Sequence, residues 1–248
     1  MTAPTAPPGE PADDCLLAVD NLVSGYGASQ VLNRMSLRVR RGECVSLLGR
    51  NGMGKSTTIK AIMGLLPAWQ GSIRWRGAAI ENRPPHRVAK AGIGLVPEGR
   101  QIFPNLSVRE NLVATAVARQ AGAGTWTLER VYGLFPRLRE RASNFGNQLS
   151  GGEQQMLAIG RALMTNPTLL ILDEATEGLS PLIRQEIWAA LEKLRDDGVS
   201  ILVIDKNIRP ILGLCDRHFI VAKGQVVWSG DSEALRSSPE VRDMYLSA

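Results

Sequence analysis

The sequence predicts an α/β fold with a helical insertion, because short apolar runs alternate with helical patterns at both ends of the chain while the middle carries helical patterns only. The chain has 248 residues, 44% hydrophobic and 21% charged, so it is long enough for one or two domains and is not mostly disordered. Residues 1–14, rich in proline and acids, are expected to form a disordered tail, and residues 15–248 the folded part.

No segment has the pattern of a membrane span or of a signal peptide. None of the apolar runs approaches the ~20 residues that a membrane helix needs. The N-terminal residues carry prolines and acids where a signal peptide carries positive charge and an apolar stretch. We therefore expect a protein that neither crosses the bilayer nor is exported by that route.

Turn residues separate the elements of the first hundred residues. Apolar runs of five to ten residues predict strands, and the periodic segments between them predict helices. The predicted strands are 16–23, 31–39, 43–48, 71–80 and 93–96, and the predicted helices are 55–66 and 86–91.

The stretch from about residue 99 to residue 165 differs, because no convincing strand interrupts its helical patterns. Ser107 and Glu110 have the spacing of a capping box, in which each residue satisfies a backbone N–H of the other. The predicted helices of this stretch are 112–119, 126–134 and 153–164. We interpret it as a helical subdomain inserted into the α/β core.

The last third of the chain returns to alternating strands and helices. Residues 168–172 predict a central parallel strand, and Ser180-Pro181 predicts the start of a helix that Gly198 ends. The remaining predicted elements are a strand at 200–204, a hairpin at 219–227, and helices at 231–235 and 241–246.

The net charge indicates the kind of partner, and the cysteine content indicates the redox state and the absence of a zinc-site pattern. The chain has 29 basic and 24 acidic residues, which gives a net charge of +5. A positive charge suits an anionic partner such as a nucleotide, a nucleic acid or a membrane surface. No long basic block favours nucleic acid over the other two. The three cysteines form no CxxC pattern and no histidines cluster near them, so reduced thiols are expected and a zinc site is not.

A glycine-rich segment carries the strongest chemical signal of the sequence. Gly49-Arg50-Asn51-Gly52-Met53-Gly54-Lys55-Ser56 matches the phosphate-binding pattern GxxxxGKS/T, and it lies between a predicted strand and a predicted helix, as that pattern requires. Its backbone N–H groups can wrap phosphate oxygens, and the following helix, which continues with Thr57, presents its positive end to them. Lys55 would reach the β- and γ-phosphates of ATP, and the Ser56 hydroxyl would ligate Mg²⁺.

Two acids after a buried strand supply the remaining chemistry of nucleotide hydrolysis. Leu169-Leu-Ile-Leu172 is followed directly by Asp173 and Glu174, at the carboxyl end of a strand where open α/β sheets bind ligands. Asp173 would hold Mg²⁺ through its water shell. Glu174 would act as the general base that polarises the attacking water.

A third motif precedes a predicted helix with an apolar face. Leu149-Ser150-Gly151-Gly152-Glu153-Gln154 offers a hydroxyl and exposed backbone N–H groups at a helix start, which together form an anion site. With the two motifs above, this segment resembles the LSGGQ signature of the ATP-binding-cassette (ABC) ATPases, with Glu153 in place of the usual glutamine. The resemblance covers essentially all of residues 15–248.

This resemblance implies a P-loop NTPase (RecA-like) core with an antiparallel β subdomain and an inserted α-helical subdomain. It also implies a head-to-tail dimer, in which Ser150, Gly151, Gly152 and Glu153 close on the γ-phosphate of the ATP held by the partner. ATP and Mg²⁺ are the implied cofactors.

Four further positions correspond to family positions, three of them with altered residues. Tyr26 matches the aromatic residue that stacks on adenine, with an ordinary turn tyrosine as the alternative. Glu98 stands where most relatives have a glutamine that contacts Mg²⁺ and senses the membrane subunit. Glu177 begins a segment in which the usual final aspartate is replaced by Ser180. Lys206 replaces the switch histidine, so it either contacts the γ-phosphate or is a solvated lysine in the first turn of the next helix.

In detail the sequence is similar to the ATPase subunits of high-affinity branched-chain amino-acid importers, as indicated by residues 96–100, 149–161 and 176–179. Such a subunit works peripherally at the cytoplasmic face of the inner membrane, with permease subunits, a second ATPase subunit, and indirectly a periplasmic binding protein. Urea or amide importers, an exporter, a non-transport ABC ATPase of DNA repair or translation, and a metabolic kinase are the alternatives. Only about fifty residues separate Glu98 from Leu149, too few for the long coiled coil of the repair class, so no nucleic-acid partner is expected.

Overall fold

The computed structural model describes residues 14–117 and 124–246, and the chain divides into two compact units. The first unit comprises residues 1–88 and 202–248, and the second comprises residues 89–201. The predicted tail lies outside the described residues except for Asp14, whose carbonyl accepts a hydrogen bond from the backbone N–H of Arg41 over 3.1 Å. Among the described residues, no helix combines the length and the apolar character that crossing a membrane requires.

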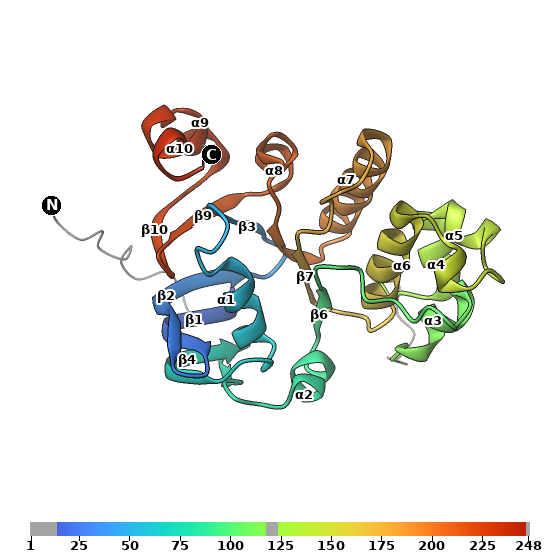
Figure 1. The fold of residues 1–248 in the computed structure, drawn as a ribbon, viewed down its shortest axis with the longest axis horizontal. Coiled ribbons are helices and arrows are strands. Elements are labelled where there is room, and N and C mark those ends of the chain that lie inside the picture. Colours follow the sequence, from blue (N-terminus) through green and yellow to red (C-terminus); the bar gives the residue numbers. More distant parts are fainter. Residues whose placement is uncertain (1–13, 118–123, 247–248) are drawn as a thin grey trace, which may run out of the picture. The chain divides into compact units, whose positions relative to one another are not determined.

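An antiparallel sheet forms the first part of the first unit, with the strand order β2-β1-β4-β5 (Figure 1). Its strands are β1 (Cys15–Tyr26), β2 (Ser29–Arg40), β4 (Ala68–Trp75) and β5 (Ala78–Ala79). The single strand predicted at 71–80 is wrong, because the chain turns at Arg76 and Gly77, both with positive φ, and folds back so that Trp75 pairs with Ala78.

The first unit also contains the strand that leads into the phosphate-binding motif. This strand, β3 (Cys44–Leu48), has all five residues buried and pairs in parallel with β9 (Arg217–Ala222), which pairs antiparallel with β10 (Gln225–Gly230). The helices of this unit are α1 (Lys55–Ile62), α8 (Ile208–Leu214), α9 (Ser232–Arg236) and α10 (Pro239–Tyr245). The helix α2 (Pro85–Lys90) and the strand β8 (Ser200–Ile204) each pass from one unit into the other.

A fully buried histidine links three elements of the first unit. The Nδ1 atom of His218 lies 2.7 Å from Ser46 Oγ, and its Nε2 atom lies 2.8 Å from Ser232 Oγ. Because the Ser232 hydroxyl donates to the carbonyl of Leu212 over 2.9 Å, it accepts from His218 Nε2–H, and Nδ1 is left to accept from Ser46. The neutral ring is therefore satisfied at both nitrogens.

This histidine predicts that acid destabilises the protein. Burial lowers the pKa of His218 from 6.5 to about 4, although Asp231 opposes the shift. Below pH 6.5 the unfolded chain binds a proton that the folded chain does not bind until about pH 4, so the free energy of unfolding falls by about 3 kcal/mol across that interval. Urea denaturation at pH 7.5 and pH 5 should show about 2 kcal/mol of this loss in the wild type, because pH 5 lies about 1.5 units below the unfolded pKa, and a smaller loss in His218→Gln. Equal losses in the two proteins would contradict the assignment.

The second unit combines two parallel strands with most of the helices. The strands β6 (Ile93–Val96) and β7 (Leu169–Asp173) pair in parallel from Ile93↔Leu169 to Val96↔Leu172. The remaining elements are α3 (Val108–Ala114), α4 (Leu128–Leu134), α5 (Pro136–Glu140), the 3₁₀ helix η2 (Gly146–Gln148), α6 (Gly151–Leu163) and α7 (Pro181–Asp196). Figure 1 shows α3, α4 and α5 gathered beside α6. The assignment of residues 99–165 as one helical subdomain stays a prediction.

The helix predicted at 112–119 is wrong in its boundaries. Ser107 caps α3, whose first residue is Val108, and its capping box with Glu110 is present as predicted. The helix ends at Ala114 because the chain then bonds to α6 instead: Val117 N–H donates to the carbonyl of Met164 over 3.0 Å. Residues 118 and 119 lie outside the described residues.

Close packing around α6 depends on one glycine. A Cβ atom added to Gly160 would lie 2.8 Å from Val131 Cγ1 and 3.0 Å from Leu112 Cδ2, so this glycine lets α3 and α4 approach α6. By contrast, a Cβ atom added to Gly133 in α4 would meet nothing within 4 Å.

These two glycines provide a matched test of the packing. Gly160→Ala should lower the free energy of unfolding by about 1–3 kcal/mol, because the core must give way to the extra methyl group. Gly133→Ala should raise it by up to about 1 kcal/mol, because alanine is the better helix former. Chemical denaturation measures both values, and a destabilised Gly133→Ala together with an unchanged Gly160→Ala would overturn the packing argument.

Candidate functional site

The glycine-rich segment forms a turn between β3 and α1. Gly49, Gly52 and Gly54 all have positive φ, between 76° and 136°. Other side chains are excluded at Gly49 for a second reason, because an added Cβ atom would lie 2.3 Å from the carbonyl oxygen of Val221. The strand end, the turn and the helix start therefore have the arrangement that the sequence predicts for a phosphate-binding loop.

Lys55 lies within this turn, although it is the first residue of a helix. Its Nζ atom donates to the carbonyls of Gly49 over 2.7 Å and Arg50 over 3.0 Å, and its side chain is largely buried. No side chain caps α1, so the N–H groups of its first turn are not used by a capping oxygen. A phosphate group bound at this turn would meet both a fixed cation and the positive end of α1.

The remaining predicted residues of the first unit surround these elements without forming one cluster. Ser56 is half-buried and Thr57 is buried, both in the first turn of α1, whereas Arg50, Asn51 and Gly52 are exposed. Tyr26, at the end of β1, is 45% exposed.

The ring of Tyr26 is partly covered in this structure. Lys60 Nζ lies 5.6 Å from the centroid of the ring and donates to the Tyr26 hydroxyl over 3.3 Å. A base that stacks on this face would displace the exposed Lys60 side chain.

Lys206 is exposed in the bend between β8 and α8. Asn207 donates to Asp205 Oδ1 from its backbone N–H over 2.9 Å and from its side chain over 2.7 Å, which fixes this bend. The alternative that places Lys206 in the first turn of the next helix is wrong in detail, because α8 begins two residues later, at Ile208.

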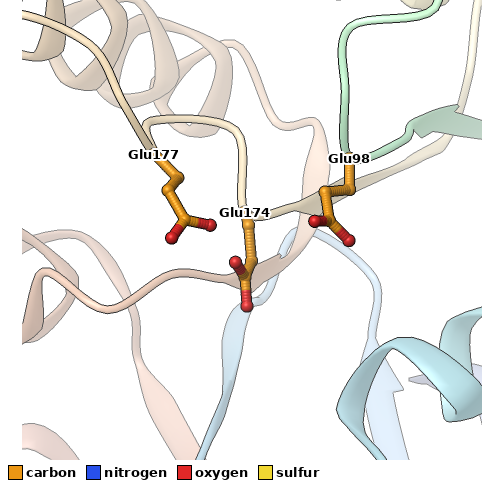
Figure 2. A group of neighbouring side chains, drawn as sticks. All are labelled: Glu98, Glu174 and Glu177. Atoms are coloured by element: carbon orange, nitrogen blue, oxygen red, sulfur yellow. The ribbon is translucent and has the colours of Figure 1, made fainter. Parts of the chain in front are cut away.

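An acidic cluster lies where β6 and β7 end in the second unit. Glu98 follows β6 and Glu174 follows β7, and because the strands are parallel their carboxyl ends share one edge. Glu177, in the turn that follows Glu174, joins them: one carboxylate oxygen of each glutamate lies within 4.8 Å of those of the other two (Figure 2). Asp173, the last residue of β7, is buried.

The donor chemistry of this cluster fits a hard divalent cation. Carboxylate oxygens are the ligands that Mg²⁺ prefers, and clustered negative charge attracts such an ion. Glu174 has φ 51°, the left-handed region that is uncommon for a residue with a side chain. This left-handed residue changes the direction of the chain directly after Asp173, the last residue of β7. No sequence pattern indicates Glu177 as a metal ligand, because its approach to the other two carboxylates depends on the turn that follows β7.

The segment resembling the signature begins α6 as predicted. Ser150 is the N-cap: its Oγ atom accepts from the Glu153 N–H over 3.3 Å, and Glu153 Oε2 accepts from the Ser150 N–H over 2.8 Å. The Ser150 hydroxyl also donates to the Glu153 carboxylate, so an anion that binds here would compete with that carboxylate for the hydroxyl hydrogen. Burial raises the pKa of Glu153, but the hydrogen bonds from Ser150 and the charge of Arg141 outweigh it, so the net pKa is lowered. Glu153 therefore stays ionised at neutral pH.

The comparison with known proteins decides the family. The family model described as "ABC transporter" matches residues 32–177, more than half of the chain, including the phosphate-binding turn, the start of α6, and Asp173. This chain belongs to the ABC transporter family. It is an ATPase of the P-loop NTPase fold, which confirms the predicted fold class.

Two curated relatives of this ABC ATPase span nearly its whole length. It is 41% identical over 231 residues to the high-affinity branched-chain amino acid transport ATP-binding protein BraG of Pseudomonas aeruginosa, covering 93% of this chain and 99% of that protein. It is 35% identical over 233 residues to the lipopolysaccharide export system ATP-binding protein LptB of Haemophilus influenzae, covering 93% and 97%.

Solved structures agree with this placement. The ATP-binding subunit of another ABC transporter has a TM-score of 0.79 at 31% identity, covering 93% of this chain and 96% of that one. A nucleotide-free ATP-binding cassette has a TM-score of 0.80 at 25% identity, covering 94% and 100%. The architecture of this ABC ATPase is therefore that of a transporter cassette.

Proposed function

We propose that this ABC ATPase binds and hydrolyses ATP to power an importer for branched-chain amino acids. The observation that carries the proposal is the 41% identity to BraG over almost the full length of both chains. Residues 96–100, 149–161 and 176–179 support it, because they carry the pattern that is similar to importer ATPases of this kind.

Four of the predicted residues have distinct roles in the proposed hydrolysis. Lys55 binds the terminal phosphates, and Tyr26 stacks on adenine. Glu174 takes a proton from a water molecule whose oxygen attacks the γ-phosphorus, while the bond to the bridging oxygen breaks and ADP leaves. Lys206, in place of a histidine, stabilises negative charge on the transferred phosphoryl group.

Mg²⁺ would be held by Ser56, Asp173 and Glu98, with Glu177 as a fourth candidate that the cluster adds. When bound, it neutralises charge on the phosphate oxygens. The carboxylates of the second unit favour this ion over softer metals, since all offer oxygen only.

The proposed assembly contains more than one chain. Ser150, Gly151, Gly152 and Glu153 bind the γ-phosphate held by a second ATPase subunit, in a head-to-tail dimer. Permease subunits anchor this dimer to the cytoplasmic face of the inner membrane, and a periplasmic binding protein acts through them. A dimeric structure of another transporter cassette and a cassette that is part of the cbiONQ transporter complex support such an assembly.

A lipopolysaccharide exporter is the second candidate, because LptB is similar over the same share of the chain at 35% identity. Importers of urea or short amides remain a third. These candidates differ in cargo and direction, and the cargo is not recognised by the ATPase subunit.

Uptake measurements in the native host test the proposed cargo. Deleting the gene should reduce uptake of radiolabelled leucine at submicromolar concentration, and a plasmid copy of the wild type, but not of Lys55→Ala, should restore it. If leucine uptake were unchanged and urea uptake were lost, the transported substrate would be urea and not a branched-chain amino acid. Unchanged uptake of both with a defect in outer-membrane lipopolysaccharide would favour the exporter.

A further inference from the structure

The chain after Glu98 forms an unusual left-handed turn. Gly99, Arg100 and Gln101 have φ of 79°, 65° and 46° in succession, and the Gln101 N–H closes the turn by donating to the carbonyl of Gly99 over 2.7 Å. A left-handed conformation costs a residue with a side chain roughly 1–2 kcal/mol. Other contacts must therefore hold Arg100 and Gln101 in place.

Arg100 holds this turn against the start of α6. Its Nη1 atom donates to Gln154 Oε1 over 3.3 Å. Its guanidinium also lies against Gly151: a Cβ atom added there would be 2.8 Å from both Nη atoms. The absence of a side chain at Gly151 is thus what makes room for the Arg100 fork.

A second arginine holds the same turn from the other end of α6. Arg161 Nη2 donates to the carbonyl of Gln101 over 2.5 Å, and its guanidinium lies 4.9 Å from the centroid of the Phe103 ring. Burial lowers the pKa of Arg161. The turn that follows Glu98 is therefore attached to both the first and the last turn of α6.

The position of Arg100 is unfavourable for a helix standing alone. A cation near the N-terminus of a helix opposes its dipole, so helix stability does not explain why an arginine lies there. The Glu153 carboxylate in the same helical turn offsets part of that charge. An anion that binds at the Ser150 N-cap would meet the positive charge of Arg100 there.

We propose that Arg100 is a positioning residue that holds the Glu98 turn and the first turn of α6 together. The inference rests on the proposed function, because it deepens the roles of Glu98 and of residues 150–153 in ATP hydrolysis. Glu98 and Ser150 then move together. An arginine is required at position 100, because only a planar guanidinium with two terminal nitrogens can both cover Gly151 and reach Gln154.

Kinetics of three variants of the full chain test this proposal. Arg100→Ala should lower kcat for ATP about tenfold while KM and the Kd for ATP stay within twofold, because the phosphate-binding turn lies in the other unit. Arg100→Lys should recover less than half of the lost rate. Arg130→Ala is the matched control, since the guanidinium of Arg130 is likewise held by other side chains. It lies 2.8 Å from Asp197 Oδ2 and 4.1 Å from the Trp126 centroid, but touches neither Glu98 nor α6 in any described contact.

A thermal melting series tests the contact without relying on activity. Gly151→Ala should raise the Tm more in the Arg100→Ala background than in the wild-type background, because alanine is the better helix former and the added methyl group displaces a guanidinium only where Arg100 is present. Additive shifts would show that the guanidinium does not cover Gly151 and would overturn the proposal.

The outcomes of the kinetic series are also distinct. A tenfold loss of kcat in Arg100→Ala, with Arg130→Ala near wild type, supports the positioning role. A kcat within twofold of wild type, or equal losses in the two alanine variants, overturns it and leaves the ATPase proposal standing. A wild-type chain without Mg-dependent hydrolysis would instead overturn the proposed function, and the positioning role with it.

Discussion

Replacing Lys55 with alanine is expected to abolish Mg-dependent ATP hydrolysis. The ammonium of Lys55 is held at the phosphate-binding turn by the carbonyls of Gly49 and Arg50, so a fixed cation is present where the phosphates are expected to bind. Losing one such preorganised donor costs about 10²–10³-fold in kcat in comparable sites, and Lys55 also contributes to binding ATP. Release of inorganic phosphate by the purified chain measures the effect.

Lys193→Ala provides the control for this experiment. Lys193 is an exposed lysine in the last turn of α7, so its removal changes the net charge equally without touching the turn after β3. It should retain the wild-type rate. Full activity in Lys55→Ala would refute the assignment of Gly49–Ser56 as the phosphate-binding loop.

Glu174→Gln should keep ATP binding and lose turnover. The amide preserves the size of the side chain at the end of β7 but cannot accept the proton of the attacking water, and a general base contributes about 10²–10⁴-fold. ATP should then accumulate in a closed dimer, because residues 150–153 of each subunit can still bind the γ-phosphate of the other.

Light scattering in the presence of ATP measures the amount of that dimer. Glu192→Gln is the matched control: Glu192 is exposed on α7, so this variant should hydrolyse ATP at the wild-type rate. If Glu174→Gln binds ATP but stays monomeric, addition of the second ATPase subunit of the transporter should restore the dimer. A monomer in both mixtures would contradict the head-to-tail arrangement.

The elements that local chemistry determines could be predicted from the sequence. Ser107, Ser150 and Ser180 each cap the helix that their sequence context indicates, because a side-chain cap depends only on residues within one turn. The buried strands β3, β7 and β8 were also predicted to within a residue, since short, mostly apolar runs bounded by turn residues leave little choice.

Elements that depend on distant contacts were predicted less well. The early end of α3 follows from a bond between Val117 and Met164, nearly fifty residues apart, which no local pattern encodes. The helices α5 and α8 are short and lack a side-chain cap, so their sequences carry little helical signal. The break between α4 and α5 does have a local cause, because Pro136 cannot continue a helix.

The candidate site divides in the same way. Lys55, Asp173 and Ser150 were found by motif, because their chemistry requires fixed spacing. Glu177 and Arg100 were assigned no metal or positioning role, because their approach to Glu98 and α6 depends on left-handed backbone at Glu174 and Arg100. Left-handed residues other than glycine are rare, and sequence patterns do not predict them reliably.

The nucleotide that stays bound after a single turnover tests the central claim most directly. The wild-type chain and Glu174→Gln are each loaded with ATP and Mg²⁺, freed of unbound nucleotide, incubated, and denatured, and the released nucleotide is identified by chromatography. We predict ADP from the wild type and ATP from Glu174→Gln. ATP from the wild type, or ADP in equal yield from both, would contradict the account.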